Sequence, residues 1–373
     1  MTAGRIKILV MGTSGIMNDG ITTWMGQTFS AMDSSDFDLV TVAFEGCDQS
    51  IVESIERAGF KVVTIPNRKK NPQAYAVSYR KLLDKEHFSI VHICCNSALA
   101  AFELHEAKKR VVRMRIAHSH NTMCSHRVAN FIMNPAFQVC LTDRYACGIA
   151  AGKWLFGSRP FTVIPNGKEL SAYSYSQDNR ESMRKELGVT KEEIVIGHVG
   201  RFNEQKNHRK LLDAYAELRS RSPRYRLALV GDGALVEETR QHAISLGISD
   251  NVSFLGRRAD VPRLLNAMDC MVFPSLYEGF PNVVLEWQLN GLPVVMSDKI
   301  TDECAITSLV SQVTLEASPA VWADAIERRT MAGRDRAADS AAARLAAKAA
   351  GYDIHENAAM LRRLYLEGVE RCK

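Results

Sequence analysis

Residues 269–298 read DCMVFPSLYEGFPNVVLEWQLNGLPVVMSD. Two short apolar runs, residues 270–273 and 293–296, lie near the ends of this stretch, and turn residues bound each of them. Such runs are typical of strands buried in a parallel sheet. Between them the sequence predicts a helix, because Pro281 suits the first helical position and Gly291 is a typical residue just past a helix end. The stretch therefore predicts a strand, a helix and a second strand.

The loop at residues 275–280 joins the first predicted strand to the helix and should bring backbone N–H groups to the start of that helix. A helix start of this kind binds anions. Glu278 in the loop and Glu286 in the helix bracket the turn, with seven residues between them. Because carboxylates repel a bare anion, the pair points to a ligand with phosphates in its middle and hydroxyls at both ends, such as a nucleotide sugar. The alternative for Glu286 alone is a solvated helix face.

Alternation of short apolar runs with helical patterns extends over most of the chain. This alternation predicts an α/β fold with doubly wound parallel sheets. In the first half, strands are expected at residues 6–11, 39–43, 62–65 and 90–93. A tract at 143–157 is interpreted as a helix that leads to a strand at 161–164, and a polar connection at 169–181 precedes a second sheet that begins at 194–199.

A second loop with ligand-binding chemistry follows the strand at 194–199 and reads GRFNEQKN over residues 200–207. Arg201 and Lys206 lie in this loop, between a strand and a helix. Arg201 offers a planar fork of donors and Lys206 a point charge, so both side chains could bind one diphosphate. The alternative is two solvated cations.

The ordered set of motifs resembles the retaining glycosyltransferases of family 4, which have the GT-B fold. The resemblance is carried by EGFPNVVLE at 278–286, GRFNEQKN at 200–207 and GDG at 231–233. RIAHSHN at 115–121, with LTDRYACGIAAGKWLFG and VIPNG after it, is similar to the capsular and exopolysaccharide branch. The resemblance implies two Rossmann-like domains with a cleft between them. They are an acceptor-side domain over 1–170, with a C-terminal helix at 353–373 that packs back on it, and a nucleotide-sugar donor domain over 171–352.

The resemblance also implies roles for individual residues. Gly20 would let the backbone approach the donor phosphates, although Asp19 stands where the family commonly has another glycine. Glu278 would hold sugar hydroxyls, Glu286 the ribose, and Gly256 with Arg257 the nucleotide base. The expected donor-binding residues are Gly20, Arg201, Lys206, Gly256, Arg257, Glu278, Gly279, Phe280, Pro281, Asn282, Val283 and Glu286. The expected catalytic residues are His118, Glu278, Arg201 and Lys206.

The tract around His118 and His120 allows three interpretations. Together with Cys124 and His126 it contains zinc-type ligands, but their spacing matches no familiar zinc site. The two histidines could also be ordinary residues at a strand end. The family resemblance implies that one of them touches the donor sugar, with His118 as the choice and His120 as the reserve. We expect no metal and no cofactor, because the nucleotide sugar, expected to be a UDP-sugar, is a substrate.

Composition and charge indicate where the protein is located and what kind of partner it has. No run reaches the roughly 18 to 20 apolar residues that span a bilayer. The nine cysteines include no Cys-x-x-Cys pair, which suits a reducing compartment. A cytoplasmic location is therefore expected. The net charge is +5, and residues 1–168 hold 20 Lys and Arg against 13 Asp and Glu. This basic half favours an anionic partner, such as a lipid-linked glycan at the inner membrane surface, with peripheral membrane contact. The alternative is an ordinary surface imbalance, and no nucleic-acid partner is expected.

The predicted function is a metal-independent, retaining transfer of a sugar to an acceptor hydroxyl. Two alternatives stay open. One is a sugar-nucleotide epimerase with a related fold, which would change the donor without any acceptor. The other is a non-catalytic protein that binds a nucleotide sugar without turnover.

Overall fold

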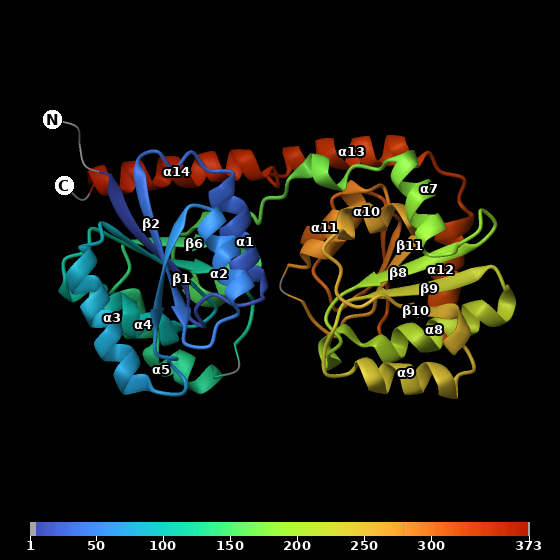
Figure 1. Cartoon of the computed structure of the whole chain (residues 1–373), viewed down its shortest axis with the longest axis horizontal. Helices are drawn as coiled ribbons and strands as arrows, with labels where there is room; N and C mark the ends of the chain where they lie inside the picture. The colour runs from blue at the N-terminus through green and yellow to red at the C-terminus, as the bar shows by residue number, and fades with distance from the viewer. Residues whose placement is uncertain (1–4, 125, 279, 372–373) are drawn as a thin grey trace. The chain divides into compact units, whose positions relative to one another are not determined.

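The computed structural model describes residues 5–124, 126–278 and 280–371 and divides the chain into two compact units (Figure 1). Unit 1 comprises Met1–Lys168 together with Gly351–Lys373, and unit 2 comprises Glu169–Ala350. Each unit is an α/β layer structure with its own sheet. No helix in the described part of the chain is both long enough and apolar enough to cross a bilayer.

The sheet of unit 1 is parallel throughout and has the strand order β3-β2-β1-β4-β5-β6-β7. Apolar side chains cover both of its faces, which explains the nearly continuous apolar strands. The strands are β1 Ile6–Gly12, β2 Phe37–Phe44, β3 Phe60–Ile65, β4 Ile90–Cys95, β5 Met114–Ser119, β6 Asp143–Ala146 and β7 Thr162–Val163. The helices are α1 Gly20–Ser30, α2 Gln49–Arg57, α3 Pro72–Glu86, α4 Ala101–Lys109, α5 Arg127–Gln138, α6 Ile149–Phe156 and α14 Ile354–Arg371.

The final helix, α14, belongs to unit 1 although more than 180 residues separate it from β7. Its residues Leu361 and Tyr365 are fully buried in the same core as Trp24 of α1. Close packing depends on glycine here, since a Cβ on Gly368 would lie 2.5 Å from the sulfur of Met114. The chain therefore crosses from unit 2 back to unit 1 before it ends.

Unit 2 has a six-stranded parallel sheet in the order β10-β9-β8-β11-β12-β13. Here too, both faces of the sheet carry a buried apolar core. The strands are β8 Ile194–Val199, β9 Tyr225–Val230, β10 Val252–Phe254, β11 Cys270–Phe273, β12 Val294–Ser297 and β13 Val310–Val313. The helices are α7 Gln177–Glu186, α8 His208–Arg221, α9 Val236–Ser245, α10 Val261–Leu264, α11 Asn282–Leu289, α12 Pro319–Met331 and α13 Arg336–Ala349.

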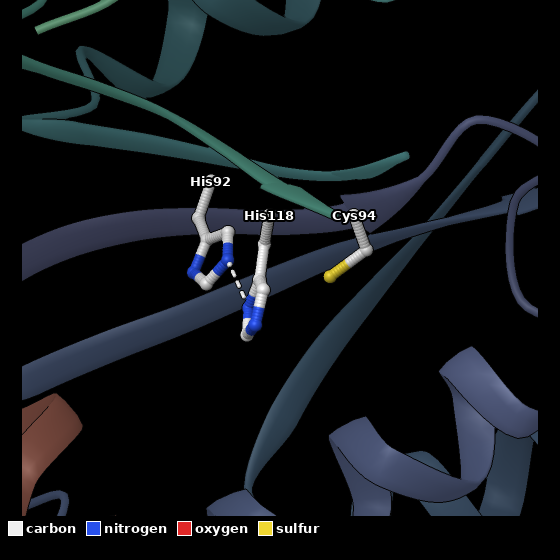
Figure 2. A group of neighbouring side chains, drawn as sticks. All are labelled: His92, Cys94 and His118. Atoms are coloured by element: carbon white, nitrogen blue, oxygen red, sulfur yellow. Dashed lines mark hydrogen bonds between the residues drawn. The ribbon is translucent and has the colours of Figure 1, made fainter. Parts of the chain in front are cut away.

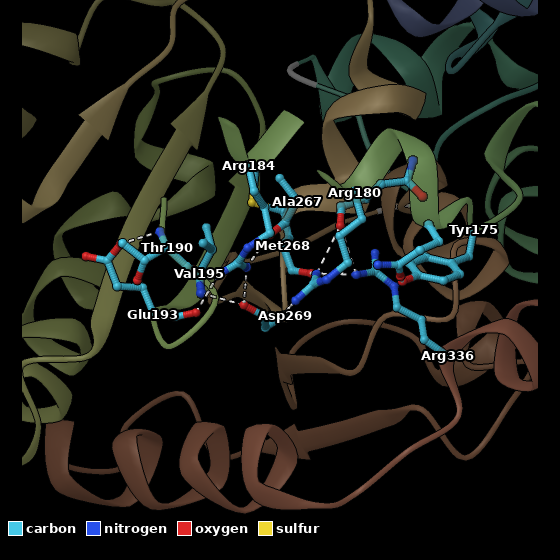
Figure 3. A network of polar contacts seen from close by, with 12 residues as sticks. Tyr175, Arg180, Arg184, Thr190, Glu193, Val195, Ala267, Met268, Asp269 and Arg336 are labelled. Carbon is cyan, nitrogen blue, oxygen red and sulfur yellow. Dashed lines mark hydrogen bonds and ion pairs between the residues drawn. The ribbon is translucent and has the colours of Figure 1, made fainter. Parts of the chain in front are cut away.

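A polar network closes the amino edge of the unit 2 sheet, where Asp269 precedes β11 (Figure 3). The Asp269 carboxylate accepts hydrogen bonds from Arg180 at 2.5 Å and Arg184 at 3.1 Å, both from α7. It also accepts from the backbone N–H of Val195 at 2.7 Å. Arg336 of α13 donates to the Met268 carbonyl at 2.6 Å, and burial lowers its pKa to about 9. These bonds tie α7 and α13 to the start of β8 and β11.

Both sheets reverse their strand order at one point, between β1 and β4 in unit 1 and between β8 and β11 in unit 2. In open parallel sheets, ligands bind outside the carboxyl ends of the strands at this switch point. The loops that follow β8 and β11 are the ones in which the sequence predicts ligand-binding residues.

Candidate functional site

The loops after β8 and β9 touch through their backbones, and two glycines permit the contact. Gly231 has φ +136°, and a Cβ there would lie 1.9 Å from the Gly200 carbonyl oxygen. Gly233 has φ +157°, and a Cβ there would lie 2.3 Å from the Phe202 carbonyl oxygen. The Phe202 N–H donates to the Asp232 carbonyl at 3.0 Å. The GDG turn therefore supports the loop that carries Arg201 and Lys206.

The loops after β8 and β11 are also joined, across the switch point. The Leu276 N–H donates to the Gln205 carbonyl at 2.8 Å, and the Gln205 side-chain amide donates to the Tyr277 carbonyl at 2.9 Å. The two loops that the sequence singles out thus form one framework, although they are about 70 residues apart in the chain.

An ion pair lies at the centre of this framework. The Lys206 ammonium, at the end of the short helix η3 (Glu204–Lys206), donates to the Glu278 carboxylate at 2.7 Å. It also lies 4.6 Å from the centroid of the Phe273 ring, a cation–π distance. The Lys206 and Glu278 side chains are only 16% and 10% exposed. The structure therefore brings these two predicted residues together, while Arg201 lies exposed in the same β8 loop.

The start of α11 is the predicted anion-binding turn. Pro281 is the N-cap of α11, not its first helical residue as the sequence predicted, and it provides no side-chain cap. Two buried polar atoms near this turn have no hydrogen-bond partner, Ser275 Oγ and Asn282 Oδ1. Phe280 and Val283 pack partly buried against the core of unit 2. Gly279 lies outside the described residues.

Glu286 is 8% exposed on α11, so the alternative of a solvated helix face is wrong. Its carboxylate bonds to Tyr173. Burial, followed by the charge of Glu286 and this hydrogen bond, raises the pKa of Tyr173. Glu286 is therefore held by a neutral phenol.

The loop after β10 reaches the same edge of the sheet. Gly256 has φ +64°, and its carbonyl accepts from the Gly231 N–H at 2.8 Å. Arg257 beside it is exposed. Gly256 and Arg257 are thus joined to the framework through the GDG turn.

Two buried histidines under the β8 loop were missed at the sequence level. His198 bonds the Val272 carbonyl through Nδ1 at 2.8 Å, and its Nε2 has no hydrogen-bond partner. His208 stacks on the Phe202 ring, with centroids 4.0 Å apart. Burial lowers the pKa of His208 to about 4, with the Lys206 charge adding to the effect, and burial also lowers the pKa of His198 well below its ordinary value. Both imidazoles are neutral near pH 7. No local motif marks them, since their partners come from β11 and from the loop fold.

In unit 1, Gly20 is the first residue of α1, and no atom lies within 4 Å of the position that its Cβ would take. Asp19, which departs from the family pattern, serves as the N-cap of α1, because its carboxylate accepts from the Thr22 N–H at 2.8 Å. The substitution therefore has a local structural role.

His118 lies on β5 with no exposed surface. Its Nδ1 is 3.2 Å from His92 Nε2 in a hydrogen bond, and its Nε2 has no partner (Figure 2). Its ring meets that of Trp24 at 4.9 Å. His120 is partly exposed as a residue, but its Nε2 is buried and has no hydrogen-bond partner. Burial lowers the pKa of His120 to about 4, against the opposing effect of a hydrogen bond with Asn166. The two histidines therefore differ in overall exposure, although the Nε2 atom of each is buried.

His92, Cys94 and His118 are the residues best arranged to hold a metal ion in the described part of the chain. Each offers one ligand atom, and these atoms lie within 4.8 Å of one another (Figure 2). This group shares only His118 with the tract of His118, His120, Cys124 and His126 that the sequence suggested. Burial lowers the pKa of His92 to about 3 and raises that of Cys94, so the protein itself favours neutral imidazole and thiol forms. His92 Nδ1 is also hydrogen-bonded to Tyr365 Oη at 2.6 Å.

Solved structures with the same architecture place the chain among proteins with the GT-B fold. HepE from Anabaena, solved with UDP, aligns with a TM-score of 0.79 at 20% identity over 97% of this chain and 100% of that one. A glycosyltransferase from Rickettsia africae aligns with a TM-score of 0.77 at 16% identity over 99% and 100% of the two chains. The predicted fold class is therefore confirmed.

Sequence comparison defines the family. Residues 179–329 match the model of the glycosyl transferases group 1 family. The putative glycosyltransferase EpsF of Bacillus subtilis is 31% identical over 96% of both chains. A UDP-Gal:α-D-GlcNAc-diphosphoundecaprenol α-1,3-galactosyltransferase of Escherichia coli is 26% identical over 62% of this chain and 63% of its own length. The chain belongs to the glycosyl transferases group 1 family, as the motifs predicted.

Proposed function

We propose that this glycosyltransferase transfers a sugar from a UDP-sugar to a hydroxyl of a lipid-linked glycan in surface polysaccharide synthesis. The observation that carries the proposal is the Lys206–Glu278 pair at the β8/β11 switch point, beside the uncapped start of α11. The relatives add support, since HepE was solved with UDP and the E. coli relative is named for a UDP-Gal donor and a diphosphoundecaprenol acceptor.

The chemistry requires charge stabilisation at the donor diphosphate. Negative charge grows on the leaving diphosphate as the glycosidic bond breaks, and preformed donors in a partly dry site stabilise that charge. Arg201, Lys206 and the N–H groups at the start of α11 supply such donors. Glu278, held by Lys206, accepts hydrogen bonds from sugar hydroxyls, and Glu286 accepts them from the ribose.

We further propose that the transfer retains the anomeric configuration without a metal ion and without a protein nucleophile. The donor phosphate would accept the proton of the attacking hydroxyl. Of the two histidines expected to orient the sugar, exposure favours His120 over His118. Peripheral contact with the inner membrane surface, from the cytoplasmic side, completes the proposal.

Calorimetric titration with UDP- and GDP-sugars, each with and without Mg²⁺, tests the donor. Binding of a UDP-sugar that Mg²⁺ leaves unchanged is expected, and no binding of any nucleotide sugar would contradict the proposal. Nuclear magnetic resonance of the product then gives its anomeric configuration. An altered nucleotide sugar formed without acceptor would favour the epimerase, and binding without turnover on a true acceptor would favour the non-catalytic alternative.

The Glu278→Ala variant tests the role of the ion pair. It leaves the Lys206 ammonium partly buried without its carboxylate. The sugar hydroxyls then lose their acceptor, and the ammonium loses the partner that positions it for the diphosphate. We expect transfer to fall by roughly a hundredfold. Near-normal transfer by this variant to a true acceptor would show that the assignment of Glu278 is wrong.

A further inference from the structure

Helix α5 of unit 1 presents an apolar face to its surroundings. Phe131 is 81% exposed, Val128 75% and Ile132 70%, and Val139, just after the helix, is 66% exposed. Pro135 and Ala136 are exposed on the same side. These residues follow the helical spacing of i, i+3, i+4, i+7 and i+8, so they form one continuous stripe. We call this set the outer stripe of α5.

The buried side chains of α5, which pack on the unit, are both polar and apolar. Asn130 accepts a hydrogen bond from the Ala98 N–H at 2.7 Å, and buried Gln138 donates to the Leu155 carbonyl at 3.2 Å. Phe137 is the large apolar side chain that α5 buries completely. A surface helix normally turns its apolar stripe to the core. In α5 the inner side also buries Phe137 and packs Met133 against the core, so the helix has one apolar face inside and a second, exposed one outside.

The chain on either side of this helix is rich in cations. Residues 107–142 contain six Lys and Arg and no Asp or Glu. Arg127 begins the helix beside Val128. At the other end, the Lys108 ammonium donates to the Val139 carbonyl at 2.9 Å, which places a cation at the end of the outer stripe. The stripe therefore has a positive charge at each end.

This charge pattern selects among the surfaces that could cover the stripe. A second copy of the chain, docked face to face on this stripe, would bring Arg127 and Lys108 of both copies into one interface, and like charges repel. An anionic bilayer supplies the opposite charge at its headgroups and an apolar layer just below them. With 12 residues, α5 is about 18 Å long, so it is too short to span a bilayer and suits the plane of the interface.

We propose that the outer stripe of α5 is a membrane-docking surface for an anionic lipid bilayer. Phe131 and Ile132 enter the boundary between headgroups and acyl chains, and Arg127 and Lys108 lie among the anionic headgroups. The inference gives a defined surface to the membrane contact proposed above, but it rests on exposure, polarity and charge alone. It does not depend on which sugar is transferred.

Flotation of the full chain with lipid vesicles tests the proposal. We expect binding to vesicles of phosphatidylglycerol and phosphatidylcholine, weaker binding at high salt, and little binding to phosphatidylcholine alone. The double variant Phe131→Ser with Ile132→Ser should bind at least roughly tenfold more weakly, because two large apolar side chains are lost from the interface. The matched control is Leu345→Ser, which removes a 73% exposed leucine from α13 of unit 2 and should bind like the unchanged protein.

Three outcomes would overturn the proposal. They are no vesicle binding by the unchanged protein, equal binding by the double variant, or a dimer in light scattering that the double variant dissolves. Thermal unfolding and UDP binding of the same samples report whether the variant is folded. If the serine variant misfolds, Phe131→Trp replaces it, since its fluorescence should shift to the blue on anionic vesicles and not on neutral ones. Vesicle binding without UDP binding would overturn the proposed donor and leave the docking surface intact.

Discussion

Each of the two edges of the unit 2 sheet holds a carboxylate that pairs with Lys or Arg. The edges differ in whether nearby buried polar atoms have hydrogen-bond partners. At the amino edge, Asp269 accepts from Arg180, Arg184 and the Val195 N–H. At the carboxyl edge, Glu278 bonds Lys206, and buried atoms nearby, such as Ser275 Oγ and Asn282 Oδ1, have no protein partner. Buried polar groups are normally hydrogen-bonded. At the amino edge, Asp269 is therefore held by hydrogen bonds from the protein. At the carboxyl edge, buried polar atoms could still bond a ligand, as expected of a binding site.

The largest loss of stability at neutral pH is expected at the amino edge. Asp269→Ala leaves Arg180 and Arg184 without their shared carboxylate, and breaking a buried ion pair costs about 3 kcal/mol at the lower end of the usual range. Asp269 is 21% exposed, so the lower end applies. Urea unfolding measures the loss. Asp324→Ala, which breaks the more exposed pair with Arg221, is the control and should cost much less. Equal losses of stability in the two variants would show that the Asp269 ion pairs stabilise the fold no more than the exposed Asp324–Arg221 pair does.

At the carboxyl edge, Arg201→Ala should affect transfer and leave stability nearly unchanged. Removing one donor to the developing diphosphate charge should lower kcat/KM by roughly a hundredfold to a thousandfold. Arg209→Ala, an exposed cation of the first turn of α8, is the matched control and should transfer normally. Transfer rates and melting temperatures of both variants measure the contrast. Normal transfer by Arg201→Ala would remove Arg201 from the site.

The next effect concerns the backbone contact between the loops. Gly231→Ala combines a positive φ with a Cβ 1.9 Å from the Gly200 carbonyl oxygen. Gly188→Ala has φ +63° and open space around its Cβ, so it isolates the cost of the positive φ, about 1–2 kcal/mol. We expect Gly231→Ala to lose more stability than this control and also to bind UDP more weakly, as measured by unfolding and calorimetry. Equal stability losses with unchanged UDP binding would show that the close approach is not needed.

The last expected effect is a pH dependence that belongs to the carboxyl edge and is seen only in acid. His208 has its pKa lowered to about 4 from an ordinary 6.5, so it stays neutral in the folded state while the unfolded chain takes up a proton below pH 6.5. The free energy of unfolding should therefore fall as the pH drops from 6.5 to about 4, by up to about 1.4 kcal/mol per pH unit for this group. His208→Phe keeps a ring against Phe202 and should reduce that slope.

Exposed His105→Gln is the control for this measurement and should leave the slope unchanged. Urea unfolding at a series of pH values gives the slopes. The same slope in the His208→Phe variant as in the unchanged protein would show that His208 is not responsible for the loss of stability in acid.

Local patterns in the sequence determined the α/β class, most strand positions and the loops that carry Arg201, Lys206 and Glu278, because apolar periodicity and turn residues act within a few positions of the chain. These local patterns gave wrong or incomplete predictions where contacts between distant residues determine the structure. The helix expected over 143–157 begins only at Ile149, since residues 143–146 pair with β5 as the strand β6. Only the tertiary structure joined Lys206 to Glu278, buried His118 against His92 and bonded Asn130 of α5 to the Ala98 backbone. Each of these outcomes depends on hydrogen bonds between segments far apart in the chain, which no local periodicity records.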